Sequence, residues 1–307
     1  MTDSRAPEPD PSRRPGAEPR LRRFPAGDPR SGITIALGGG FSRGFAHLGV
    51  LEVLEQEKIP VSAIVGTSIG GLLGAAYADG ISASDLCDLG RRVRLRDFLR
   101  FHHSNPGGQE RRKDCICKFV QEWFHAERLE GLAIPTAIVA TDLDSGAPYV
   151  FTKGPVELAI RAGCAFPGLV RPVKHDGRLL ADGCIAAPVP TEIAARMHGG
   201  CVLGVRVDST VTSCAPSHQA KEDLDPLFGA ARRRSLETSW ARGADILLEP
   251  RVHQIDWNDF SRVDEAFSAG VEAMRRALPS LIGLLSRRAQ LPTAPGISPT
   301  PESGLTL

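Results

Sequence analysis

The sequence has no excess of charge of either sign, because 37 Lys and Arg residues stand against 36 Asp and Glu residues and leave a net charge of +1. This balance argues against a protein that binds nucleic acid through bulk electrostatics. The sequence also has no apolar run long enough for a bilayer span, since the longest weakly polar stretch, residues 63–78, is short and contains four glycines. Residues 1–31 hold seven prolines, seven arginines and no apolar stretch, so no signal peptide is expected.

Seven cysteines are scattered along the chain in an odd number and without the spacing of a disulfide framework. That pattern is typical of a reducing compartment, so we predict a cytoplasmic location. Cys115 and Cys117 lie close in sequence but lack a second pair at zinc-finger spacing. No metal site is therefore predicted.

The composition divides the 307 residues into a folded block and two tails. Residues 1–31 and 287–307 are rich in Pro and have little to bury, so both are predicted to be disordered. Residues 32–286 contain no convincing linker or repeat and form one predicted domain. Within it, residues 102–109 and 209–225 are predicted to be surface loops.

The beginning of the folded block alternates between strand and helix patterns. Residues 33–37 and 61–65 are apolar and β-branched, as in buried strands, whereas residues 45–58 and 72–78 favour helices. This order predicts a βαβ unit, a parallel sheet with a right-handed crossover, and the α/β class. Further strands are expected at residues 134–143 and 201–207, and an amphipathic helix at residues 264–278.

The second strand runs into Gly66-Thr-Ser-Ile-Gly70, which matches the G-x-S-x-G pattern of a nucleophile turn. Such a turn needs Gly66 and Gly70, because a Cβ at either position would collide with the neighbouring strand or helix. We predict that Ser68 is a nucleophile. The alternative is a tight turn between strand and helix that has no chemical role.

The first strand ends in Gly38-Gly-Gly-Phe-Ser-Arg-Gly44, which places unencumbered amides before a helix N-terminus. One interpretation is an oxyanion hole, and another is a dinucleotide cradle. The strict G-x-G-x-x-G fingerprint fails at Arg43, and no acidic residue ends the second strand to hold a ribose. The loop also lacks the Lys of a phosphate-binding Walker loop. A flexible turn without a ligand is the third interpretation. Arg43 is expected to brace the loop, and the alternative is that it adds positive charge there.

A serine nucleophile needs a base, and the residues leave two possibilities open. His175, His198 and His253 are candidate imidazoles. The alternative is Asp182, which with Gly183 follows a short apolar stretch at the predicted carboxyl end of a strand. Asp176-Gly177, in contrast, has the sequence of a hairpin turn.

Taken together and in this order, the glycine loop, the Ser68 turn and Asp182-Gly183 resemble the patatin-like phospholipase family. The similarity is greatest to its bacterial branch, which is similar to the catalytic region of the neuropathy target esterases, and it runs from about residue 32 to residue 278. Supporting stretches are Ala46-His-Leu-Gly-Val-Leu51, Ala140-Thr-Asp-Leu143, Arg161-Ala-Gly-Cys-Ala-Phe-Pro-Gly168 and Ala186-Ala-Pro-Val-Pro190. His47, within the first of these, is expected to pack structurally.

The resemblance implies a three-layer α/β/α sandwich with a mainly parallel central sheet. It also implies a serine hydrolase of lipid acyl esters that uses neither metal nor cofactor and needs no histidine. In such an enzyme Ser68 is the nucleophile and Asp182 the base. The implied oxyanion hole consists of the amides of Gly38, Gly39 and Gly40, and the implied supporting residues are Arg43, Gly44, Gly66, Gly70 and Gly183.

One residue departs from the family pattern, because Cys184 stands where the family usually has the second glycine of Asp-Gly-Gly. An alternative function therefore stays open, namely a catalytically weak or inactive regulator that binds lipid or a protein partner.

A further stretch is rich in arginine, and it has two interpretations. One is peripheral contact with an anionic membrane surface at the inner face of the membrane. The other is a solvated cationic helix face. The arginines in question are Arg91, Arg92, Arg94, Arg96 and Arg100.

Overall fold

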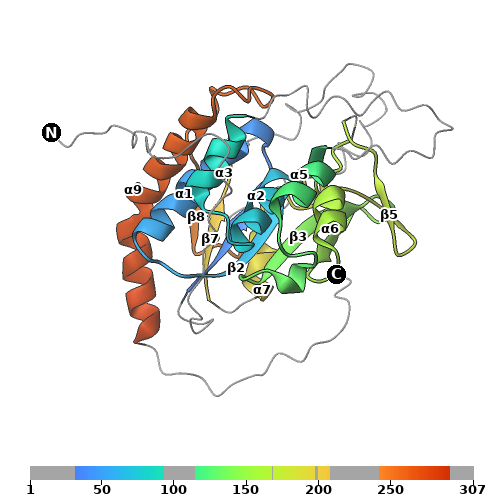
Figure 1. Cartoon of the computed structure of the whole chain (residues 1–307). Coiled ribbons are helices and arrows are strands. Elements are labelled where there is room, and N and C mark those ends of the chain that lie inside the picture. Colours follow the sequence, from blue (N-terminus) through green and yellow to red (C-terminus); the bar gives the residue numbers. More distant parts are fainter. Residues whose placement is uncertain (1–31, 93–114, 168, 198–199, 208–241, 291–307) are drawn as a thin grey trace.

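The computed structural model describes residues 32–92, 115–167, 169–197, 200–207 and 242–290 (Figure 1). Predictions for residues 1–31, for the loops at 102–109 and 209–225, and for residues 291–307 lie outside the described residues.

A mixed sheet forms the centre of the described structure, with the strand order β5-β6-β3-β2-β1-β7-β8 and with β4 paired to β3. The strands β3, β2, β1, β7 and β8 pair in parallel, whereas β4, β5 and β6 extend the sheet by antiparallel pairing. The strands are β1 (Ile33–Leu37), β2 (Val61–Thr67), β3 (Thr136–Asp142), β4 (Pro148–Phe151), β5 (Val173–His175), β6 (Arg178–Asp182), β7 (Cys201–Val205) and β8 (Ile246–Leu248).

Helices lie on both sides of this sheet, as the ribbon shows (Figure 1). The α-helices are α1 (Phe45–Gln56), α2 (Ile69–Ala78), α3 (Ala83–Gly90), α5 (Cys115–Trp123), α6 (Val156–Gly163), α7 (Thr191–Met197) and α9 (Val263–Ala289). Short 3-10 helices are η1 (Phe41–Gly44), η2 (Leu129–Gly131) and η3 (Gly183–Ile185). The predicted α/β class, with a largely parallel sheet between helical layers, is confirmed.

The two faces of the sheet belong to separate hydrophobic clusters. In β1, Ile33, Ile35 and Leu37 join the large cluster with the buried side chains of α1, α2, α3, α6 and α9, whereas Ala36 joins a smaller cluster with α7. This alternation follows from the period of two in a strand. Because both faces are covered, β1 is apolar along its whole length, as its sequence indicates.

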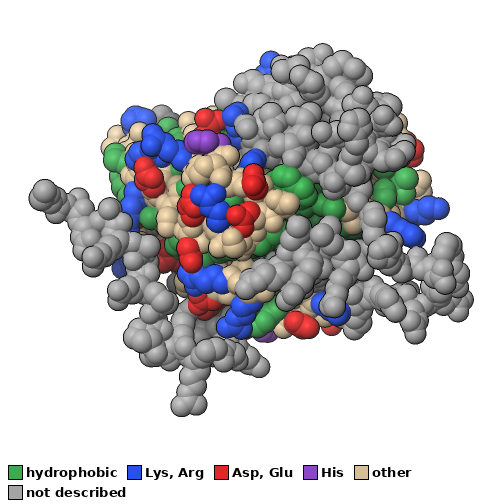
Figure 2. Space-filling model, turned by 90° about the horizontal axis from the view of Figure 1, so that it is seen from above, with side chains coloured by type: hydrophobic (Ala, Val, Ile, Leu, Met, Phe, Trp, Pro, Cys, Tyr) green, Lys and Arg blue, Asp and Glu red, His purple; other side chains and the backbone are tan. Residues whose placement is uncertain are grey.

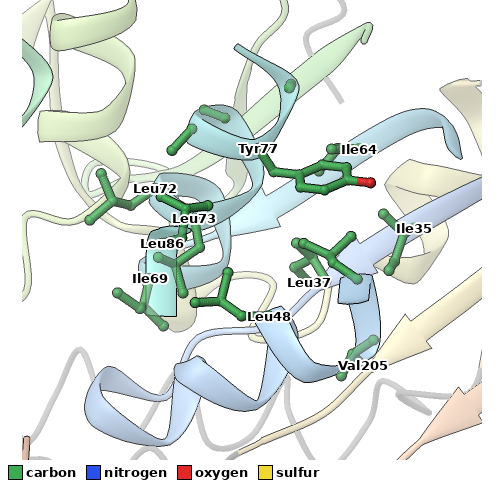
Figure 3. Close-up of a cluster of buried hydrophobic side chains, with 14 of the residues drawn as sticks. Ile35, Leu37, Leu48, Ile64, Ile69, Leu72, Leu73, Tyr77, Leu86 and Val205 are labelled. Carbon is green, nitrogen blue, oxygen red and sulfur yellow. The ribbon is translucent and has the colours of Figure 1, made fainter. Parts of the chain in front are cut away.

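Part of the larger cluster is shown in Figure 3. Side chains of β1, β2 and β7 meet those of α1, α2 and α3 there, among them Leu37, Leu48, Ile64, Ile69 and Leu86. Tyr77 is buried in the same cluster. The glycine loop follows the end of β1, and Ser68 follows the end of β2. Both strand ends are therefore held in place by packing against α1, α2 and α3.

The hairpin prediction is confirmed, because β5 and β6 pair on either side of Asp176-Gly177. Both turn residues have positive φ angles, 47° and 74°, as a two-residue turn of the mirror-image type requires. The last helix differs from its prediction. It continues past Pro279 to Ala289, and so includes three residues of the predicted C-terminal tail.

Helices α1 and α9 approach each other closely through two glycines. A Cβ on Gly270 of α9 would overlap the carbonyl oxygen of Ala46, and a Cβ on Gly49 of α1 would overlap that of Phe267. These overlaps involve backbone atoms, so a side chain at either position must push the two helices apart.

We therefore expect Gly270→Ala to lower the free energy of unfolding by about 2 kcal/mol or more, because overpacking outweighs the better helix propensity of Ala. The matched control is Gly283→Ala in the same helix, where the nearest atom, Arg287 Nη1, lies 3.5 Å from the added Cβ. That control should gain up to about 1 kcal/mol. Urea denaturation of both variants measures the difference, and equal stabilities would contradict the close approach.

Candidate active site

Ser68 lies between the last residue of β2 and the first residue of α2. Its backbone has φ 54° and ψ −128°, a conformation that a non-glycine residue rarely adopts. Its side chain is 6% exposed. The sequence predicted such a strained strand-to-helix turn, and its geometry presents the hydroxyl at the end of the sheet.

The two glycines of this turn are required by close approach, as predicted. A Cβ on Gly66 would overlap the backbone of Gly71, and a Cβ on Gly70 would overlap the carbonyl oxygen of Leu37. The turn is thus closely packed between α2 and the end of β1.

Asp182 is the last residue of β6, as predicted, and its position is set by the register of the sheet. Thr67 pairs with Val139 of β3, and the next residue of β3, Ala140, pairs with Asp182 on the other side. The Thr141 hydroxyl donates to the Asp182 carbonyl oxygen at 2.8 Å, and the Asp182 amide donates to the Ala165 carbonyl oxygen at 3.0 Å. Ser68 and Asp182 are therefore held at the same end of the sheet, on either side of β3.

The two side chains meet. Ser68 Oγ donates a hydrogen bond to Asp182 Oδ2 at 2.7 Å, and the Cys184 amide donates to Asp182 Oδ1 at 2.8 Å. The carboxyl group is fully buried, and this burial raises the pKa of Asp182 to about 6, although hydrogen bonds from Cys184 and Ser68 oppose the shift. The site thus contains a hydroxyl bonded to a carboxylate that is a better base than an ordinary Asp.

The glycine loop, residues 38–44, begins where β1 ends and lies beside Ser68. A Cβ on Gly39 would come within 3.3 Å of Ser68 Cβ. The amides of the loop differ from the prediction, however, because Gly38 donates to Val205 and Gly39 to Pro188, both at 3.0 Å. Two of the three predicted oxyanion donors are therefore already hydrogen-bonded within the protein.

Two other amides differ in this respect. Within the described part of the chain, neither the Gly40 amide nor the Ile69 amide, at the first position of α2, donates to another backbone group. The first N–H groups of a helix have no partner inside it, which makes such a position suitable for an anion. Ile69 was not among the residues predicted from the sequence, although the residue after the serine of a G-x-S-x-G turn is a usual oxyanion donor.

Residues distant in sequence anchor the glycine loop. Arg43 is buried, and its Nε donates to the Ile255 carbonyl oxygen at 2.7 Å. Ser42 Oγ lies 2.9 Å from the Asp256 carbonyl oxygen and 2.8 Å from that of Trp257. A Cβ on Gly44 would overlap the Ile69 side chain, and one on Gly183 the Val139 carbonyl oxygen. Arg43 therefore braces the loop, and these two glycines allow close packing around it.

His47 contacts the loop from beneath. Its Nε2 lies 2.7 Å from the Gly38 carbonyl oxygen, and because a carbonyl only accepts, Nε2 carries the proton. Burial lowers the pKa of His47 to about 4, so the ring is neutral at neutral pH. The residue holds the loop, which goes beyond the packing role expected from the sequence.

The candidate histidine bases do not contact Ser68 in the described structure. His175 packs against the rings of Tyr149 and Phe151, and His253 is exposed. His198 lies outside the described residues. The partner of the Ser68 hydroxyl is the Asp182 carboxylate.

The arginine-rich stretch is only partly described. Arg91 forms ion pairs with Asp88 and Asp264, while Arg94, Arg96 and Arg100 lie outside the described residues. On the described part of the face seen from above, acidic and basic side chains are interspersed (Figure 2).

Within the described residues there is neither a candidate metal cluster nor a candidate membrane span. No group of three or more His, Cys, Asp or Glu residues there could hold a metal ion, and the side chains of Cys115 and Cys117 are not described. None of the helices in these ranges combines the length and apolarity needed to span a bilayer.

The buried Asp182 and His47 should make opposite contributions to stability between pH 4 and pH 6.5. Asp182 binds its proton more tightly when folded, with its pKa raised from 3.8 to about 6, so its contribution falls as pH rises through this range. His47 binds its proton less tightly when folded, with its pKa lowered from 6.5 to about 4, so its contribution falls as pH falls.

As the pH rises from 4 to 7, the free energy of unfolding of Asp182→Asn should increase by about 3 kcal/mol relative to that of the native chain. The size follows because one pKa unit corresponds to about 1.4 kcal/mol. His47→Gln should show the opposite trend, with a relative gain of about 3 kcal/mol as pH falls from 7 to 4. Urea titrations at several pH values measure both trends. Subtracting the free energy of unfolding of the native chain at the same pH cancels the effect of the other titrating groups. Parallel pH profiles for the two variants would contradict the burial of these groups.

Comparison with known proteins gives a consistent result. The model of a family described as patatin-like phospholipase matches residues 35–195, just over half of the chain. An uncharacterized NTE family protein of Mycobacterium tuberculosis is 32% identical over 193 residues, which cover 62% of this chain and 53% of that protein. Patatin-like phospholipase domain-containing protein 6 of Homo sapiens is 31% identical over 188 residues, 58% of this chain and 13% of that protein.

The chain thus spans about half the length of the mycobacterial relative and a small part of the human one. Among solved structures, VipD from Legionella pneumophila matches with a TM-score of 0.48 at 12% identity, covering 87% of this chain and 71% of that one. The type III effector protein ExoU matches with a TM-score of 0.42 at 11% identity, over 86% of this chain and 54% of that one.

The family match includes the glycine loop, the Ser68 turn and Asp182, the three segments whose resemblance was noted in the sequence. The chain belongs to the patatin-like phospholipase family.

Proposed function

We propose that the protein is a serine hydrolase of lipid acyl esters, of the phospholipase or lysophospholipase type, that acts through Ser68 and Asp182. The observation that carries this proposal is the 2.7 Å hydrogen bond between the Ser68 hydroxyl and the buried Asp182 carboxylate. Membership of the patatin-like phospholipase family supports an ester hydrolase of this kind.

In the first half of the reaction, Ser68 Oγ attacks the ester carbonyl carbon while its proton passes to Asp182 Oδ2. The tetrahedral intermediate then collapses, the bond to the leaving alcohol breaks, and Asp182 returns the proton to that alcohol. An acyl-enzyme on Ser68 remains, and Asp182 is again a carboxylate.

In the second half, a water molecule replaces the alcohol. Asp182 takes a proton from the water as its oxygen attacks the acyl carbon, and the proton then returns to Ser68 Oγ as the fatty acid leaves. One carboxylate thus serves as base and as acid in each half, which its raised pKa favours, because a group that titrates near the working pH can do both.

Negative charge on the carbonyl oxygen needs hydrogen-bond donors in both halves. We assign this role to the Gly40 amide of the glycine loop and to the Ile69 amide at the start of α2. Gly38 and Gly39 support the loop instead, since their amides already bind Val205 and Pro188. Each preorganised donor of this kind is worth on the order of 10²–10³ in turnover.

The substrate class and the cellular location are both part of this proposal. The assignment of a lipid acyl ester as substrate rests on membership of the family. The cytoplasmic location and the peripheral contact with an anionic membrane remain predictions from the sequence.

Ser68→Ala should lower the hydrolysis of p-nitrophenyl butyrate and of lysophospholipid by at least about 10³-fold, because the acyl acceptor is lost. The fold should remain intact, since the change removes a single hydroxyl. A fluorophosphonate probe should label the native chain and should not label Ser68→Ala.

Ser145→Ala, in an exposed turn, is the control and should be labelled like the native chain. Undiminished hydrolysis by Ser68→Ala would refute the assignment of the nucleophile. A folded native chain that neither hydrolyses these esters nor reacts with the probe would favour the alternative of an inactive regulator.

The pH profile of kcat/KM should have an acidic limb with a midpoint near pH 6. Asp182 must be ionised to accept the Ser68 proton, and its pKa is raised to about 6, so activity should fall about tenfold per pH unit below that value. Stopped assays with an uncharged ester between pH 4.5 and pH 8 measure this limb. A midpoint near pH 4 would show that the carboxyl group is not desolvated in the free enzyme.

A further inference from the structure

Cys184 occupies the position where the family usually has a glycine, in the short helix η3 that begins directly after Asp182. Its amide donates to Asp182 Oδ1 at 2.8 Å, while Oδ2 accepts from Ser68. Any residue except proline would supply this amide. The side chain is therefore what distinguishes this chain from the usual family pattern.

The thiol lies between the carboxylate and the glycine loop. An S–H donor at this position lowers the pKa of the Asp182 carboxyl group and so opposes the effect of burial. A Cβ added to Gly39 would overlap the Cys184 sulfur and would lie 3.3 Å from Ser68 Cβ. The sulfur thus fills the space that a side chain at Gly39 would need, next to the nucleophile.

These contacts have two physical consequences. A donor to the ionised carboxylate favours its charged form and so works against burial. The sulfur also supports the loop from the side of the dyad, while Pro188 and Val205 bind its amides and His47 binds the Gly38 carbonyl. A glycine at position 184 would supply neither the donor nor the support.

We propose that Cys184 is a positioning residue of this site, whose thiol holds the Asp182 carboxylate and the glycine loop at a fixed separation. This role rests on the hydrolase function proposed above. Within the described residues, the Asp182 carboxylate accepts hydrogen bonds from the Ser68 hydroxyl and the Cys184 amide, and no ion pair joins it to a charged side chain. Neutral His47 touches only the loop.

Three substitutions separate the two parts of this role. Cys184→Ser keeps a short donor, Cys184→Ala keeps only the Cβ, and Cys184→Gly restores the usual family residue. We expect Cys184→Ser to retain kcat/KM within about threefold, with the acidic limb at or below its native midpoint, because a hydroxyl is the stronger donor.

Cys184→Ala should move the acidic limb upward by about half to one pH unit, because one donor to the carboxylate is lost. Cys184→Gly should show the same shift and, in addition, a lower kcat on the plateau above pH 8, because the loop loses its lateral support. Cys87→Ala, on α3, is the control for removing a thiol elsewhere and should leave the limb unchanged.

The same variants can be examined without any substrate. The titration of Asp182, followed by ¹³C NMR of carboxyl-labelled protein and assigned by its loss in Asp182→Asn, should move upward in Cys184→Ala and return in Cys184→Ser. Thermal unfolding of each variant verifies that it is folded.

The outcomes distinguish this proposal from the proposed function. If Asp182 titrates at the same pH in the native chain and in Cys184→Ala, the positioning role is wrong, whatever the activity. If the titration shifts as expected but the native chain hydrolyses no ester, the contact stands and the hydrolase function fails. If Cys184→Gly and Cys184→Ala have the same kcat on the plateau above pH 8, the proposed support of the loop by the sulfur is wrong.

Discussion

The hydrogen bond from Ser68 Oγ to Asp182 Oδ2 joins two strands that are not neighbours in the sheet. Strand β3 lies between them, pairing in parallel with β2 and antiparallel with β6, so the register on both of its edges must be correct for the hydroxyl and the carboxylate to meet. A slip of one residue on either edge would turn the side chain on that edge to the other face of the sheet. The contact between Ser68 and Asp182 therefore depends on the strand that contributes neither residue.

Several features of the same site lower the stability of the folded chain. A fully buried carboxylate is costly, and its raised pKa expresses that cost. The Ser68 backbone is strained, and the ring of His47 is buried with Nδ1 lacking a partner among the described residues. Such features persist because the large core beneath the loop and α2 over-determines their positions. The site concentrates unfavourable groups where the packing around them is strongest.

Local patterns in the sequence were sufficient to predict those elements whose structure depends on residues close in sequence. The βαβ unit, the hairpin at Asp176-Gly177, the Ser68 turn and the position of Asp182 all follow from residues close in sequence. Helix α9 was expected to end at residue 278 but continues through Pro279 to Ala289, because packing of the helix outweighs a single proline. The use of the Gly38 and Gly39 amides by Val205 and Pro188 could not be predicted, since those acceptors are remote in sequence. Cys184 against Gly39 is a contact of the same kind.

The anchoring of the glycine loop reaches beyond the segment by which the family is recognised. That segment ends at residue 195, whereas the carbonyls that hold Ser42 and Arg43 belong to residues 255–257, and β1 pairs with β7 from residue 201 onward. An excised fragment of residues 35–195 would carry every motif, yet one edge of its first strand would lie open and its loop would lose these anchors. The shortest stretch that identifies the family is thus smaller than the cooperative unit that folds. Domain boundaries for expression should follow the hydrogen bonds of the loop rather than the limits of sequence similarity.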